Sequence, residues 1–241
     1  KFKELLAESV NDQLVADVPV GFFLSGGLDS SALVATAAQN HTDLQTFSIG
    51  FDDTTYSETT FAKQVADLFQ TTHFEQTICL DNIKQMFPQL KQWYDEPFAD
   101  ASAFPTYLVS QCAKRQVTVA LSGDGGDELF GGYRWYKMFQ RLSPLAKGPL
   151  TGIAQGAGTI QRHLSMRNPI RRFLTPLTLI GDNPFSLGAK LHWGLNKPQK
   201  QKYASLLKID DDYDDYWYVR KFWKPNLPLL TRLQYMDSHT Y

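Results

Sequence analysis

The sequence predicts an α/β fold, in which a parallel, twisted sheet carries helices on both faces and is followed by a helical region. Over the first 123 residues, short apolar stretches suited to buried strands alternate with longer stretches of helical periodicity. This alternation is typical of strand–helix–strand units, whose strands are parallel. Beyond about residue 143 the sequence continues with interrupted helical stretches and no clear strand.

The first elements are defined by their apolar pattern and by the residues that end them. A helix is expected at 2–16, because its apolar residues recur on one helical face and Pro19 follows. VGFFL, at 20–24, is an uninterrupted apolar run typical of a strand buried on both faces. A helix at 29–39 follows the turn SGG, with Asp29 in its first turn. LQTFSIGF, at 44–51, predicts a second strand.

The later elements repeat the pattern. A helix is expected at 57–69, a third strand at 73–78, where polar and apolar residues alternate, and helical stretches at about 81–94 and 103–115. VTVALSG, at 117–123, predicts a fourth buried strand that leads directly into a glycine-rich turn. Ligands of parallel sheets bind beyond the carboxyl ends of the strands, so the turns SGG and SGDGG are expected at one crevice.

This pattern predicts that residues 1–142 form the sheet domain and residues 143–241 a helical continuation of it. The sequence begins at Lys1, without an initiator methionine, and ends on MDSHTY, without a helix stop signal. We therefore expect a fragment of a longer chain, truncated at its C-terminus.

The composition argues against several classes of protein. With 24 basic and 25 acidic residues the net charge is −1, which gives no sign of a nucleic-acid partner. No apolar run approaches the roughly 20 residues that a membrane-spanning helix needs. Cys79 and Cys112 form no CxxC pair, and the histidines lack metal-ligand spacing. We expect a cytoplasmic protein with reduced thiols and with neither a nucleic-acid nor a membrane partner.

The stretch FFLSGGLDSSALVA, at 22–35, is predicted to hold phosphate. Glycines between a strand and a helix allow close approach to an anion, and the helix N-terminus adds N–H donors and a positive dipole end. The stretch has no lysine of the Walker type but carries Asp29, which would repel a bare phosphate. A Mg²⁺ ion between Asp29 and the phosphates resolves that conflict. The alternative is an ordinary helix N-cap, in which serine and aspartate are common.

The stretch LSGDGGDELFGGY, at 121–133, places three acids in the second turn, namely Asp124, Asp127 and Glu128. Acids beside a phosphate site are costly unless a cation compensates them. A second carboxylate facing Asp29 would complete a Mg²⁺ site. The alternative is an acidic surface loop.

Both stretches resemble known motifs. SGGLDSS is similar to the pyrophosphate loop SGGxDS of the N-type ATP pyrophosphatases, and LSGDGGDELFGGY resembles the signature of the synthetase domain of the glutamine-hydrolysing asparagine synthetase family. The resemblance extends to DVPVGFFLSGGLDSS, TFSIGF, DEPFADASAFPTY and RLQYMDSHTY, and thus to nearly the whole chain. It implies an adenine nucleotide alpha-hydrolase-like fold and the absence of an N-terminal glutaminase domain from this sequence.

The resemblance also implies the roles of individual residues. The residues that it assigns to ATP are Leu24, Ser25, Gly26, Gly27, Asp29, Ser30, Ser31, Ile49, Ser122 and Gly123. Leu24 and Ile49 would contact the adenine through their main chain. Asp29 and Asp127 would hold the metal on pyrophosphate, and Asp124 would be the catalytic acid that supports an acyl-adenylate.

The implied activity is an ATP- and Mg²⁺-dependent ligase that adenylates a carboxylate, expected to be aspartate, releases pyrophosphate and forms asparagine with ammonia from a glutaminase domain. We also expect that the protein can form a homodimer. Alternatives are an amidotransferase acting on a sugar or cell-envelope carboxylate, a tRNA sulfur transferase, and a nucleotide-binding module without catalysis. Some aspartate-specific members carry an arginine where this chain has Asp100, which leaves the acceptor open.

Overall fold

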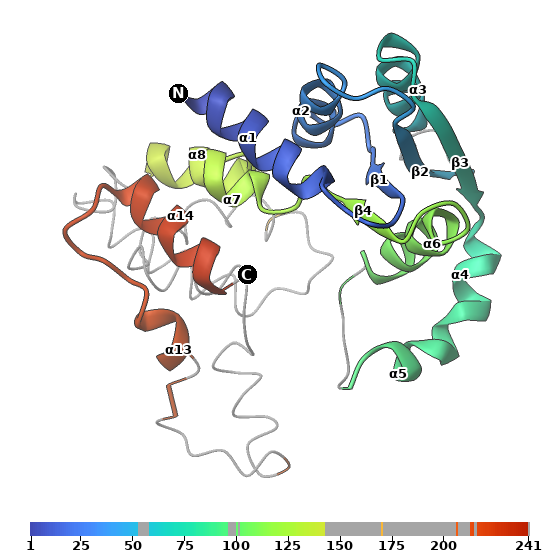
Figure 1. Ribbon diagram of the computed structural model, residues 1–241. Coiled ribbons are helices and arrows are strands. Elements are labelled where there is room, and N and C mark those ends of the chain that lie inside the picture. The colour runs from blue at the N-terminus through green and yellow to red at the C-terminus, as the bar shows by residue number, and fades with distance from the viewer. Residues whose placement is uncertain are drawn as a thin grey trace. The chain divides into compact units, whose positions relative to one another are not determined.

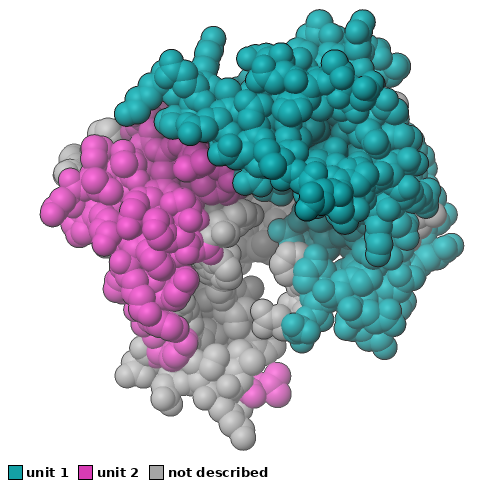
Figure 2. Space-filling model, viewed as in Figure 1, with its two compact units in different colours: residues 1–124 teal, residues 125–241 magenta. Residues whose placement is uncertain are grey.

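The computed structural model describes residues 1–52, 58–95, 100, 102–142, 170, 206, 213–214 and 216–240. The helices and strands labelled in Figure 1 are α1 (Phe2–Leu14), β1 (Val20–Phe23), α2 (Leu28–Ala37), β2 (Gln45–Phe51), α3 (Thr59–Leu68), β3 (Thr72–Ile78), α4 (Leu80–Met86), the 3₁₀ helix η1 (Phe87–Gln89), α5 (Leu90–Trp93), α6 (Ala103–Ala113), β4 (Val119–Leu121), α7 (Gly126–Phe130), α8 (Arg134–Leu142), α13 (Trp217–Arg220) and α14 (Leu229–Thr240). They fall into two compact units, Lys1–Asp124 and Gly125–Tyr241, coloured teal and magenta in Figure 2.

The first unit is built on a four-stranded sheet in the order β3-β2-β1-β4, and every pair in it is parallel. Phe23 at the end of β1 pairs with Phe47, and Phe22 pairs with Leu121 of β4. All four strands therefore end at the same edge of the sheet. The predicted α/β fold class, with a parallel sheet flanked by helices, is confirmed.

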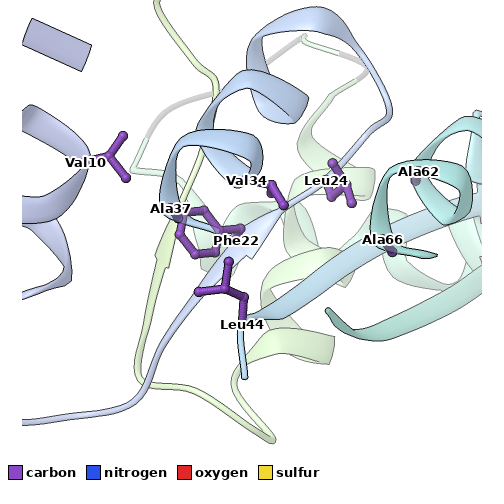
Figure 3. Packing of buried hydrophobic residues seen from close by; sticks show 8 residues of the cluster. All are labelled: Val10, Phe22, Leu24, Val34, Ala37, Leu44, Ala62 and Ala66. Carbon is purple, nitrogen blue, oxygen red and sulfur yellow. The ribbon is translucent and has the colours of Figure 1, made fainter. Parts of the chain in front are cut away.

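One face of the sheet is covered by α2 and α3, with α1 packed on α2. Figure 3 shows the core of this face, to which each of these elements contributes. Phe22 and Leu24, alternate residues of one chain segment, are each 1% exposed. Burial of such side chains contributes about 1.5–3 kcal/mol each. Val10, 3% exposed, ties α1 into the same core.

The opposite face is covered by α6. Phe47, fully buried, packs there against Cys112 and Val117, and its ring stacks on that of Phe74 at 5.3 Å between centroids. Burial raises the pKa of the Cys112 thiol, so this cysteine is an apolar core group. Phe22 and Phe47 thus mark the two faces of the sheet.

Two elements differ from the sequence prediction. The helical stretch expected at 81–94 is divided into α4, η1 and α5, because Pro88 within η1 supplies no N–H for a continuous helix. The strand expected to be buried at 117–123 is only three residues long, and Val119 is 40% exposed. Among the described strands β4 pairs with β1 alone, so it is an edge strand of the described sheet.

In the second unit, Tyr136, Val219, Leu233 and Met236 form a small core. The Tyr136 hydroxyl donates a hydrogen bond to the buried carboxylate of Asp237. Most of the predicted helical continuation, residues 143–212, lies outside the described residues apart from single positions. The domain boundary predicted at 142/143 therefore stays a prediction. No helix in the described ranges is long and apolar enough to cross a membrane.

Candidate functional site

The ends of β1 and β2 are staggered. β1 ends at Phe23, opposite Phe47, whereas β2 continues to Phe51. The Leu24 N–H donates to the Phe47 carbonyl at 2.8 Å, on the β1 side of the strand, and the Asp52 N–H donates to Ile78 at 3.2 Å, on the β3 side. Main-chain groups of successive strand residues point to alternate sides.

Ile49 is two residues beyond Phe47 and three before Asp52. Its N–H and C=O therefore point to the β1 side, beyond the end of β1. Because β1 ends before β2, the N–H donor and the C=O acceptor of Ile49 lie side by side and face away from β3. No side chain is needed to present this pair.

A cavity of about 220 Å³ lies at these strand ends. Leu24 and Ile49, the two residues predicted to contact adenine, both line this strand-end cavity. Its other walls include Phe51 after the stagger, Ala62 of α3 and Val109 of α6. It is thus lined mostly by apolar groups, with the open main-chain edge of Ile49 among them.

A second cavity, of about 250 Å³, lies between the two glycine-rich turns. Seven of the predicted site residues line this loop cavity: Ser25, Gly27, Asp29, Ser30, Ser122, Gly123 and Asp124. The two cavities share four lining residues, Phe23, Ser25, Thr106 and Val109. They are therefore neighbouring compartments at the carboxyl ends of the strands.

The first turn is held by its own serines. The Ser25 hydroxyl accepts the Gly27 N–H at 3.2 Å and lies 3.1 Å from the Ser30 hydroxyl, which donates to the Gly27 carbonyl at 3.3 Å. Gly27 is the N-cap of α2 and makes no side-chain capping hydrogen bond. The positive end of the α2 dipole thus lies at the loop cavity, where an anion is stabilised.

Two glycines are required by space. A Cβ on Gly26, whose φ is +80°, would lie 2.6 Å from the Ala62 nitrogen of α3. A Cβ on Gly123 would lie 2.8 Å from the Ser30 nitrogen. The first turn is therefore packed against α3 on one side and against the second turn on the other, at main-chain distances.

Two carboxylates, Asp29 and Asp124, line the loop cavity, and Asp124 accepts a hydrogen bond from the Ser122 hydroxyl at 2.9 Å. Carboxylates beside an anion site are the donor set that Mg²⁺ uses together with phosphate oxygens, so these residues fit the metal. The described residues contain no group of three or more histidine, cysteine or acidic side chains that could hold an ion by themselves. Asp127 belongs to the second unit, and its pairing with Asp29 stays a prediction.

The structure adds detail for three residues named in the sequence analysis, Gly26, Ser31 and Asp100, whose roles stay predictions. Gly26 lines neither cavity, because it packs on α3. Ser31 also lines neither, and its hydroxyl is buried without a hydrogen-bond partner among the described residues. Asp100 is exposed and accepts the Ser102 N–H at 2.8 Å, which lowers the pKa of the Asp100 carboxyl. This bond gives Asp100 a local role at the start of α6.

Sequence reasoning missed Thr106 and Ser48. Thr106 of α6 lines both cavities, and Ser48 of β2 lines the strand-end cavity. The signal for Ser48 was its hydroxyl within the apolar run TFSIGF, where a buried polar residue needs a partner.

The sequence is similar to those of known proteins. Residues 1–241 match the model of the family described as asparagine synthase. The chain belongs to the asparagine synthase family. It is 34% identical over 248 residues to glutamine-hydrolyzing asparagine synthetase 1 of Bacillus subtilis (strain 168), covering 99% of this chain and 37% of the relative. It is 45% identical over 149 residues to a putative glutamine-hydrolyzing asparagine synthetase 2 of Methanocaldococcus jannaschii, covering 61% of this chain and 29% of the relative.

The chain thus spans little more than a third of the Bacillus relative's length. A putative glutamine-hydrolyzing asparagine synthetase of Mycobacterium tuberculosis (strain H37Rv) is 39% identical over 140 residues, which are 58% of this chain and 22% of the relative. The family assignment confirms the resemblance seen in the two glycine-rich motifs.

Proposed function

We propose that this chain is the ATP-dependent, amide-forming part of an asparagine synthetase, with aspartate as the carboxylate substrate. The observation that carries the proposal is the pair of adjoining cavities at the strand ends. One presents an open main-chain edge among apolar walls, and the other presents a helix N-terminus and two carboxylates. A nucleotide has a matching division between its base and its phosphates.

The strand-end cavity suits adenine. The N–H and C=O of Ile49 complement N1, which accepts, and the exocyclic amino group, which donates. Val109 and Ala62 supply the apolar contacts that a flat base requires. Leu24 forms the floor where β1 ends, and its side chain is 1% exposed.

The loop cavity suits the phosphates. Ser25, Gly27 and Ser30 would surround the departing pyrophosphate at the N-terminus of α2. Asp29 and Asp127 would hold Mg²⁺, which neutralises the charge that develops on pyrophosphate. Ser122 and Gly123 would line the nucleotide from the second turn.

The chemistry has two steps. A carboxylate oxygen of aspartate attacks the α-phosphorus of ATP, and the bond to the β-phosphate oxygen breaks, giving aspartyl-AMP and pyrophosphate. Ammonia then attacks the acyl carbon, AMP leaves, and the nitrogen loses a proton to form asparagine. Asp124, which accepts a hydrogen bond from Ser122, would support the acyl-adenylate.

The relatives are named as glutamine-hydrolyzing enzymes, which supports glutamine as the source of the amide nitrogen. We propose that ammonia released from glutamine reaches the acyl-adenylate. The second candidate for the carboxylate is a sugar or cell-envelope acid, because Asp100 lies in the stretch DEPFADASAFPTY that resembles the family's substrate segment, and an acid is a poor partner for the carboxylate of aspartate.

The test is isotope exchange between pyrophosphate and ATP in the purified protein with Mg²⁺. Aspartate should support exchange, and adding ammonia should convert exchange into net asparagine and AMP. Asp124→Ala should bind ATP almost normally yet lose exchange by roughly a hundredfold or more, the scale for an electrostatic group at a reacting centre. Asp12→Ala, which removes an exposed acid of α1, is the matched control. Exchange that depends on a sugar acid and ignores aspartate would exclude the aspartate assignment, and exchange that survives in Asp124→Ala would remove Asp124 from the mechanism.

A further inference from the structure

A chain of polar side chains runs through the sheet on its α3 side. The Thr46 hydroxyl lies 2.8 Å from the Thr71 hydroxyl and 2.8 Å from Nδ1 of His73. Nε2 of His73 lies 3.0 Å from the Ser48 hydroxyl. Thr46 is fully buried and Ser48 is 3% exposed.

Thr46 and Ser48 are buried, which is costly unless their hydroxyls are hydrogen-bonded. Thr46 and His73 are register partners on neighbouring strands, and Ser48 follows Thr46 on the same face of β2. Both ring nitrogens of His73 are therefore engaged. One end of the chain is closed by Thr71, and the other end, Ser48, lines the strand-end cavity.

The geometry makes Ser48 a polar group of the proposed adenine cavity. A hydroxyl has one hydrogen and two lone pairs, and His73 uses only one of these. The next residue, Ile49, directs its carbonyl into the same cavity. An adenine amino group has two hydrogens, so the two residues can each accept one of them.

We propose that Ser48, positioned by His73, accepts a hydrogen bond from the exocyclic amino group of the bound base and thereby selects adenine over bases with a 6-oxo group. This inference rests on the proposed function, because it takes the strand-end cavity to hold the base. Ser48 is the specificity-determining residue, and His73 is a positioning residue that does not touch the nucleotide.

In a neutral imidazole either ring nitrogen can carry the hydrogen, and the proposal assigns it to Nδ1 of His73. Burial lowers the pKa of His73 from its ordinary value of 6.5, and this effect outweighs the opposing charge of Glu75. Nδ1–H donates to Thr46, which donates to Thr71. Nε2 accepts the Ser48 hydrogen, and the lone pairs of Ser48 face the cavity.

Protonation of His73 reverses the last bond. Nε2–H then donates to Ser48, whose hydrogen turns towards the cavity, where it opposes an amino group and matches a carbonyl oxygen. The charged groups facing His73 are Glu75 on its own strand and the Lys63–Asp67 pair of α3, which is closed at 3.0 Å. β2 contributes no charged residue.

The experiment measures adenosine and inosine affinities of the chain by titration calorimetry at about pH 7.5 and about pH 4.5, because the lowered pKa of His73 places its protonation below the ordinary histidine range. These nucleosides carry no phosphate, so the loop cavity and the metal do not enter. In the wild type, the adenosine-to-inosine affinity ratio should fall about fivefold on acidification, the factor that corresponds to a hydrogen bond of about 1 kcal/mol. In Ser48→Ala the ratio should already be about fivefold lower at the higher pH and should not change with pH. His73→Gln should also be independent of pH, whereas the matched control His41→Gln should behave as the wild type.

The wild-type comparison requires no variant, and circular dichroism at both pH values verifies folding. A wild-type ratio that does not change with pH, or a Ser48→Ala ratio that still does, overturns the role of Ser48 and His73 alone. Failure of adenosine to bind the folded wild type at either pH removes the base cavity and the proposed function with it.

Discussion

Gly26 and Gly27 are adjacent in the first glycine-rich turn, yet the structure predicts opposite tolerance to alanine. Gly26 has φ +80°, and an added Cβ would lie 2.6 Å from the Ala62 nitrogen and 2.6 Å from the Phe61 Cβ. Gly27 has φ −68°, and its added Cβ would meet only the Ser25 hydroxyl, at 3.1 Å. The first position combines an unfavourable backbone with a clash against a helix main chain, and the second has neither.

The expected costs follow from these distances. A left-handed conformation costs alanine about 1–2 kcal/mol, and overpacking typically costs about 1–3 kcal/mol, so Gly26→Ala should lower the free energy of unfolding by about 2–5 kcal/mol. At Gly27, loss of a favourable N-cap residue is offset by reduced entropy of the unfolded chain, which leaves a change within about 1 kcal/mol.

The assay is urea unfolding of both variants and the wild type, followed by circular dichroism. A slope against urea that stays constant among the three proteins would assign the shift in midpoint to stability. Equal destabilisation by the two substitutions, or a larger effect at Gly27, would contradict the packing of the turn against α3.

Two further predictions concern other sites. The folded-state pKa of His73 is lowered below 6.5, so the unfolded chain binds more protons and the free energy of unfolding should decrease as pH falls below about 6.5. In thermal unfolding, His73→Gln should lose less stability on acidification than the wild type or His41→Gln. An equal loss of stability in all three proteins would exclude His73 as the source of the pH dependence. A Cβ at Gly132 would lie 1.9 Å from Oδ1 of Asp127, so Gly132→Ala should displace that carboxylate. This variant should need a higher Mg²⁺ concentration to bind ATP, with an unchanged affinity for adenosine. An unchanged Mg²⁺ dependence of ATP binding, measured by calorimetry, would remove Asp127 from the proposed metal site.

The order of elements in the first unit was predictable because each signal is local. Apolar runs, turn glycines and Pro19 define β1 and its neighbours without reference to other parts of the chain. The family could also be assigned from two short motifs. Asp29 and Asp124 were both assigned to the site, and they line one cavity because the carboxyl ends of parallel strands share one edge.

The remaining features depend on tertiary distances that no local pattern encodes. Ser30 and Ser31 are adjacent, but successive helix residues are rotated by about 100°, and only Ser30 lines the cavity. The stagger that exposes the main chain of Ile49 depends on the relative lengths of β1 and β2. Likewise, the partner of Ser48 is 25 residues away, on a neighbouring strand.

The unequal length of β1 and β2 has a consequence for how base preference can evolve. In the proposed base cavity, the main-chain donor and acceptor at position 49 are retained with any residue except proline, which has no N–H. Other point mutations at that position therefore leave this part of the proposed recognition unchanged. Exchange among apolar residues at position 49 is therefore tolerated. A shift in base preference requires either a change in strand length, which disturbs the whole sheet, or a substitution of a side chain that lines the strand-end cavity. Ser48 lines this cavity, and under the role that we propose for it a substitution there is the more accessible route to a changed nucleotide preference.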